Sequence, residues 1–110
     1  MSRWVDVCSI DDLLPEAGIS VLVDGRQLAL FYFPLSNELY AIDNYDPFSH
    51  TYSLSRGLVG DIKGEPMVSA PVYKQHFSLK SGQCLDDETV KVESYPVRIV
   101  NDRVEVSIPE

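Results

Sequence analysis

Two segments decide the fold of this chain, and neither has the sequence pattern of a β-strand over its whole length. The first reads Asn44-Tyr45-Asp46-Pro47-Phe48, with Ser53-Leu54-Ser55-Arg56-Gly57 a few residues later. The second reads Ala70-Pro71-Val72-Tyr73-Lys74-Gln75-His76-Phe77, and continues to a glycine at position 82. In both, a proline is followed by an aromatic residue. Proline and glycine interrupt the region from 43 to 65, and a connection of that length is usually functional or disordered.

Outside these segments, short apolar runs of period 2 alternate with turn residues, which is typical of β-strands. Asp24-Gly25 predicts a tight hairpin turn, and Ser9 is expected to cap a helical turn over residues 9–12. The expected strands cover residues 4–8, 19–23, 26–33, 38–42, 67–70, 73–79, 95–100 and 103–108. Many short strands with one helical turn indicate an all-β sandwich or barrel.

Composition narrows the class of protein. A chain of 110 residues with 45% hydrophobic side chains suits a single globular domain. No apolar run approaches the ~20 residues that span a bilayer, so we expect no membrane segment. The N-terminal residues lack the apolar core of a secretory signal, and two cysteines make no disulfide framework, so a cytoplasmic location is expected. The net charge of −8 argues against nucleic acid as a partner, and it is compatible with docking on a basic face of another protein.

The metal-binding side chains show no ligand spacing. The chain has two cysteines, Cys8 and Cys84, and two histidines, His50 and His76. No Cys-x-His or Cys-x-x-His pair occurs among them. Tight metal sites usually show close ligand spacing, whereas a free cysteine usually behaves as a small buried hydrophobe. We therefore expect both cysteines to be structural.

The two segments resemble the cluster-binding loops of Rieske [2Fe–2S] proteins, which run Cys-Pro-His and Cys-Pro-x-His. On that pattern Asp46 and Ala70 stand at the cysteine positions, and Phe48 and Tyr73 stand at the histidine positions. A Rieske centre needs two thiolates on one iron and two imidazoles on the other. The resemblance therefore implies a β-sandwich base with a small cluster-binding-like loop subdomain, about residues 44–57 and 70–82, that lacks the cluster. The likeness extends from Trp4 to Ile108, and residues 1–110 are expected to form a single domain.

A Rieske-like chain with these replacements is similar to the small subunits of assimilatory NADH-dependent nitrite reductases. That resemblance implies an accessory subunit, without catalytic residues or cofactor of its own, in a complex that reduces nitrite to ammonia. The partner it implies is the large catalytic subunit, carrying FAD, an iron–sulfur cluster and sirohaem. The residues agree, because nitrite reduction needs a redox cofactor and the chain has no Gly-x-Gly-x-x-Gly dinucleotide fingerprint.

The tip of the loop subdomain is the predicted docking site on the large subunit. Six residues are candidates for it: Asp46, Phe48, His50, Tyr73, Lys74 and His76. Aromatic side chains beside charges are typical of protein interfaces. A second interpretation is that Phe48 and Tyr73 fill the volume of the missing cluster. A third is a new mononuclear iron or zinc site formed by Asp46, His50 and His76.

Two other functions stand beside the accessory subunit. An electron-transfer ferredoxin needs the four missing ligands, which nearly excludes it. An independent protein-interaction or regulatory module on a cluster-free Rieske-like scaffold is the stronger alternative, and chain length does not exclude it.

Overall fold

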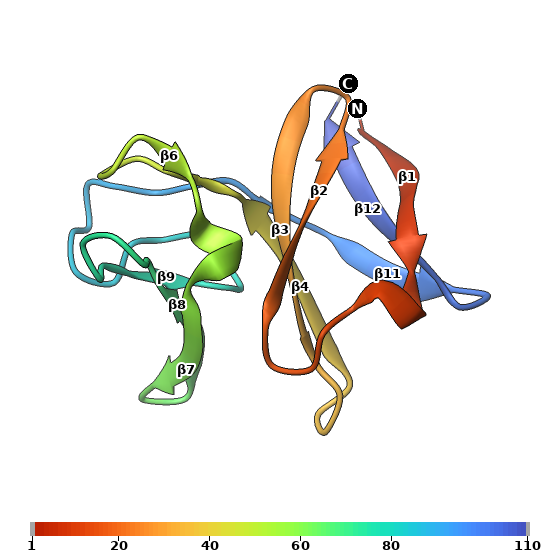
Figure 1. The fold of residues 1–110 in the computed structure, drawn as a ribbon, viewed down its shortest axis with the longest axis horizontal. Helices are drawn as coiled ribbons and strands as arrows, with labels where there is room; N and C mark the ends of the chain where they lie inside the picture. The colour runs from red at the N-terminus through yellow and green to blue at the C-terminus, as the bar shows by residue number, and fades with distance from the viewer. Residues whose placement is uncertain (1, 110) are drawn as a thin grey trace.

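The computed structural model describes residues 2–109, which form β-strands and two short 3-10 turns (Figure 1). The strands are β1 (Ser2–Ser9), β2 (Gly18–Val23), β3 (Arg26–Phe33), β4 (Glu38–Asp43), β5 (Tyr45–Asp46), β6 (Thr51–Tyr52), β7 (Leu58–Ile62), β8 (Glu65–Ser69), β9 (His76–Ser78), β10 (Ser94–Tyr95), β11 (Val97–Val100) and β12 (Arg103–Pro109). The 3-10 turns are η1 (Ile10–Asp12) and η2 (Leu54–Arg56). Within residues 2–109, no helix is long and apolar enough to cross a membrane.

The larger part of the molecule is a base of two antiparallel sheets. One has the strand order β1-β12-β11, and the other has the order β10-β4-β3-β2. Their inner side chains form one hydrophobic core, to which β3 contributes Leu28 and Leu30 and β12 contributes Val104 and Val106. The chain ends meet at one end of the base, because Ser2 pairs with Pro109 (Figure 1).

Strand β3 lies between the two parts of the molecule, and both of its faces are buried. Successive side chains of a strand point to opposite faces. Leu28 and Leu30 therefore enter the core of the base, while Ala29 and Phe31 enter a second core on the other face. The uninterrupted apolar run from Leu28 to Phe31 is thus the local signature of a strand between two layers.

The smaller part, the loop subdomain, packs on that second face. It contains the β5–β6 hairpin, η2 and the three-stranded sheet β7-β8-β9, to the left in Figure 1. Its apolar side chains in the second core include Leu54, Val68, Ala70 and Phe77. The backbones approach closely here: a Cβ at Gly57 would collide with the Ser69 carbonyl and the Val68 side chain.

The all-β sandwich expected from the sequence is confirmed, including the capped turn. The Ser9 hydroxyl accepts a hydrogen bond from Asp11 N at 3.1 Å, and the Asp12 carboxylate accepts one from Ser9 N at 2.9 Å. The Asp24-Gly25 turn joins β2 to β3 as predicted. The region 43–65, expected to lack a regular pattern, contains β5, β6 and β7.

The strand predicted over residues 73–79 is shorter than expected and begins only at His76. The reason is local. Lys74 has a φ of +66°, which is incompatible with an extended strand. Its backbone N–H donates to the Ala70 carbonyl at 3.0 Å and closes a turn instead.

Candidate functional site

Asp46, at the end of β5, organises the first loop from inside. Its carboxylate is fully buried and accepts hydrogen bonds from Phe48 N at 2.9 Å, Ser49 N at 3.4 Å and the Ser49 hydroxyl at 2.9 Å. Hydroxyl contacts continue from Ser49 to Thr51 at 2.6 Å and from Thr51 to Ser53 at 2.8 Å. A buried charge needs such partners. Asp46 therefore holds the loop by hydrogen bonds and has no surface to offer a partner.

The other three predicted ligand positions have different surroundings. Phe48 is half-buried and packs on the second core, with its ring centroid 6.1 Å from that of Phe77. Ala70 is completely buried. Tyr73 is 61% exposed. Filling of an internal volume therefore fits Phe48, and the same interpretation is wrong for Tyr73.

The two loops close in the same way. In each, the residue four places after a predicted cysteine position donates its N–H to the carbonyl at that position: His50 to Asp46 at 2.8 Å, and Lys74 to Ala70 at 3.0 Å. Both donors have a positive φ, 59° and 66°. This conformation is uncommon for residues other than glycine, and it persists where the surrounding structure imposes it.

The imidazoles have separate partners. His50 Nδ1 lies 3.0 Å from the Tyr45 hydroxyl, and His76 Nδ1 lies 3.0 Å from Asp86 Oδ2. The Asp86 carboxylate also accepts a bond from His76 N at 2.6 Å, and this backbone bond lowers the pKa of Asp86. The structure does not bring Asp46, His50 and His76 together. Among residues 2–109, no group of three or more His, Cys, Asp and Glu side chains could hold a metal ion.

The donor set at the four predicted ligand positions does not fit a [2Fe–2S] cluster. The carboxylate of Asp46 is engaged by donors of its own loop, and the side chains of Phe48 and Ala70 have no donor atom. Tyr73 extends towards solvent. Cluster ligation needs thiolates and imidazoles. The two cysteines are buried elsewhere, Cys8 in the core of the base and Cys84 in the second core.

Several aromatic and apolar side chains of the two loops are exposed. Tyr45 packs edge-on against Tyr52, with 5.1 Å between ring centroids, and Tyr52 is 56% exposed. In the second loop, Val72 and Tyr73 are exposed beside Lys74, whose ammonium donates to the Pro71 carbonyl at 3.0 Å. Exposed aromatic side chains are enriched at protein interfaces.

One important residue was missed by sequence reasoning. Asn44 is buried, its side-chain oxygen accepts a bond from Ser55 N at 2.7 Å, and its carbonyl accepts one from Leu54 N at 3.0 Å. Its own N–H donates to the Gln27 carbonyl at 3.0 Å, so it fastens the first loop to β3. A single asparagine beside a predicted loop gives no signal of this role.

Known proteins match this fold over its full length. The sequence profile of the Rieske-like [2Fe-2S] domain matches residues 3–107. The nitrite reductase (NADH) small subunit of Escherichia coli K12 is 42% identical over 106 residues, which cover 96% of this chain and 98% of that protein. The solution structure of the E. coli protein NirD has a TM-score of 0.90 at 40% identity and covers 100% of both chains.

A further relative has a different organisation. The nitrite reductase [NAD(P)H] large subunit of Klebsiella oxytoca is 41% identical over 101 residues, which cover 92% of this chain and 10% of that protein. A sequence of this kind is thus one part of a much longer polypeptide. Together with the full-length matches, this shows that the chain belongs to the Rieske-like [2Fe-2S] domain family and, within it, to the family of nitrite reductase (NADH) small subunits.

Proposed function

We propose that this chain is the non-catalytic small subunit of a NADH-dependent nitrite reductase and that it binds the large catalytic subunit. The observation that carries this proposal is the end-to-end correspondence with the E. coli small subunit, at 42% identity over 98% of that protein. The match also covers 96% of this chain, so it extends across the Rieske-like domain from one end to the other. In this role residues 1–110 act as one Rieske-like domain.

The large-subunit sequence from Klebsiella oxytoca supports direct association of the two subunits. In that relative, a sequence 41% identical to this chain belongs to the same polypeptide as the rest of the large subunit. Covalent linkage holds a domain beside its partner at high effective concentration. A separate chain must reach the same arrangement through a binding surface.

The small subunit contributes no redox centre in this proposal. Side chains do not store and deliver the electrons of nitrite reduction, so cofactors must do so. These are the FAD, iron–sulfur cluster and sirohaem expected in the large subunit. The hydrogen-bonded Asp46 and the apolar Phe48 and Ala70 support a loop end held together by side chains. A reducing cytoplasm suits the two buried free cysteines.

Docking is assigned to the tip of the loop subdomain. Of the six candidates, His50, Tyr73 and Lys74 are exposed, whereas Phe48 and His76 are half-buried and Asp46 is buried. Exposed Tyr52 and Val72 extend the candidate surface. Asp46 and Phe48 support this surface from behind.

The test is reconstitution with the large subunit encoded in the same genome. The two chains are expressed separately, mixed and analysed by size-exclusion chromatography, and NADH oxidation on addition of nitrite is measured with and without the small subunit. We expect co-elution and a higher or more stable activity. Separate elution with unchanged activity would contradict the proposal and favour an independent interaction module.

A further inference from the structure

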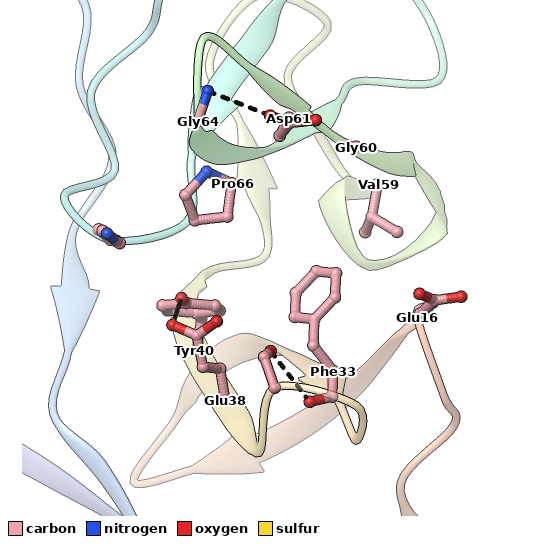
Figure 2. Close-up of a pocket in the computed structure, with 11 residues that line it drawn as sticks. Glu16, Phe33, Glu38, Tyr40, Val59, Gly60, Asp61, Gly64 and Pro66 are labelled. Carbon is pink, nitrogen blue, oxygen red and sulfur yellow. Dashed lines mark hydrogen bonds between the residues drawn. The ribbon is translucent and has the colours of Figure 1, made fainter.

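A cleft of about 560 Å³ separates the base from the loop subdomain, and the predicted docking tip takes no part in it. Figure 2 shows its walls: Phe33 and Tyr40 of the β3–β4 hairpin face Val59 and Pro66 of the β7–β8 hairpin. Cavities of this size bind specific groups in many proteins. No sequence motif pointed to this cleft, because its residues come from two distant hairpins.

The wall formed by the β3–β4 hairpin is aromatic. The rings of Phe33 and Tyr40 pack edge to face, with 5.9 Å between centroids and an interplanar angle of 68°. Both side chains are half-buried, and Figure 2 shows the Phe33 ring projecting between Tyr40 and Val59. A ring face carries a negative partial charge, so it attracts a cation.

Carboxylates stand on both walls. Glu38 belongs to the β3–β4 hairpin and Asp61 to the β7–β8 hairpin, while Glu16 and Lys80 also line the cleft. Glu38 accepts a hydrogen bond from the Tyr40 hydroxyl at 2.5 Å, and Asp61 accepts one from Gly64 N at 3.1 Å. Among the described residues, the four salt bridges do not involve these carboxylates.

The hydrogen bond from Tyr40 also favours the ionised form of its partner. It lowers the pKa of Glu38. Burial, together with this bond, raises the pKa of Tyr40 to about 12. At neutral pH the cleft therefore presents an ionised carboxylate beside a protonated phenol. Three carboxylates against one ammonium make it negative.

This chemistry excludes some occupants and favours one. Nitrite and the pyrophosphate of NADH are anions, which the carboxylates repel. A plain apolar side chain would displace water from these carboxylates and bring no positive charge to replace it. A guanidinium is planar, stacks on aromatic rings, and carries several donors for carboxylates.

We propose that the cleft between the β3–β4 and β7–β8 hairpins receives an arginine side chain of the large subunit. This inference rests on the proposed function and adds a second contact, electrostatic in kind, to the one predicted at the tip of the loop subdomain. The net charge of −8 makes the whole chain complementary to a basic partner face. The cleft is also free of the chain termini, which meet at the opposite end of the base from the β3–β4 turn (Figure 1).

The test is the affinity of the small subunit for the purified large subunit, measured at low and at physiological salt. The cleft variant is Glu38→Gln with Asp61→Asn, which keeps an acceptor for the Tyr40 hydroxyl and for Gly64 N. The matched control is Asp11→Asn with Asp102→Asn, two exposed carboxylates that do not line the cleft. Circular dichroism verifies that both variants fold.

We expect the cleft variant to bind about tenfold more weakly, with a smaller salt dependence, and the control to bind as the wild type does. A Val59→p-benzoylphenylalanine variant should crosslink to a large-subunit peptide that contains an arginine. Substituting that arginine by alanine should weaken wild-type binding and leave the cleft variant unchanged, as expected for two coupled sites.

The outcomes separate the two proposals. If the wild type binds the large subunit and the cleft variant binds equally well, the cleft inference is wrong while the proposed function stands. A crosslinked peptide without arginine has the same consequence. If the wild type fails to bind, both proposals fail together.

Discussion

Replacing Asp46 by alanine should loosen the first loop strongly, because this carboxylate provides the acceptors that hold it. Phe48 N at 2.9 Å and Ser49 N at 3.4 Å both lose their acceptor. The Ser49 hydroxyl can turn to Thr51, which lies 2.6 Å away, so its loss is small. A hydrogen bond to a charged group contributes about 1.5–3 kcal/mol, and the longer bond contributes less.

One full bond and part of a second correspond to about 2–4 kcal/mol. Removing a buried charge also removes its desolvation penalty, which offsets part of the loss. We therefore expect Asp46→Ala to lower the free energy of unfolding by about 2–3 kcal/mol. Asp46→Asn keeps an acceptor for the two N–H groups, and we expect it to lower that free energy by only about 1 kcal/mol.

The assay is urea denaturation followed by circular dichroism, with wild type, both Asp46 variants and Asp11→Ala as an exposed control. The control should stay within about 0.5 kcal/mol of the wild type. The slope against urea should not change, because the fold is retained. A loss below about 1 kcal/mol for Asp46→Ala, or equal losses for alanine and asparagine, would refute the hydrogen-bond explanation.

Four further variants test other contacts of the structure. Phe48→Ala should lower the free energy of unfolding by about 2–3 kcal/mol, because its half-buried ring packs on the second core. Tyr73→Ala should change it by less than about 0.5 kcal/mol yet weaken binding to the large subunit, and a stability loss equal to that of Phe48→Ala would contradict its exposed position. Gly57→Ala should destabilise by about 1–3 kcal/mol, since the new Cβ meets the Ser69 carbonyl, and a melting temperature equal to that of the wild type would show that the backbones separate easily. The pKa of Asp86 in the folded protein lies below its ordinary value of 3.8, so the stability that it contributes is present above about pH 4 and is lost as the pH falls through the lower folded value. Asp86→Asn should therefore make the free energy of unfolding less dependent on pH in the acid range. An unchanged dependence would contradict the contact between Asp86 and His76.

Much of the base could be predicted from the sequence because its strands have a clear pattern. Alternating apolar residues and the Asp24-Gly25 turn define β2, β3 and β12 with little error. The run from Leu28 to Phe31 also contains the signal for burial on both faces, although alternation alone would not show which layers cover it.

The loops were less predictable because tertiary contacts decide their conformation. Lys74 adopts a positive φ that no propensity would give a lysine, so the predicted strand begins late. Tyr73 was a candidate for filling a volume and is exposed, because its loop turns outward at the bond from Lys74 to Ala70. Asn44 and the aromatic cleft depend on residues far apart in the sequence, which single-sequence patterns do not join.

The most direct test of the central claim is the iron content of the chain purified without oxygen from cells that assemble iron–sulfur clusters. The claim is that Asp46 and Phe48 hold the loop end where a Rieske protein holds its cluster. We predict essentially no iron per chain in a folded, colourless protein. About two iron atoms per chain with visible absorbance, the content of a [2Fe–2S] cluster, would contradict the account.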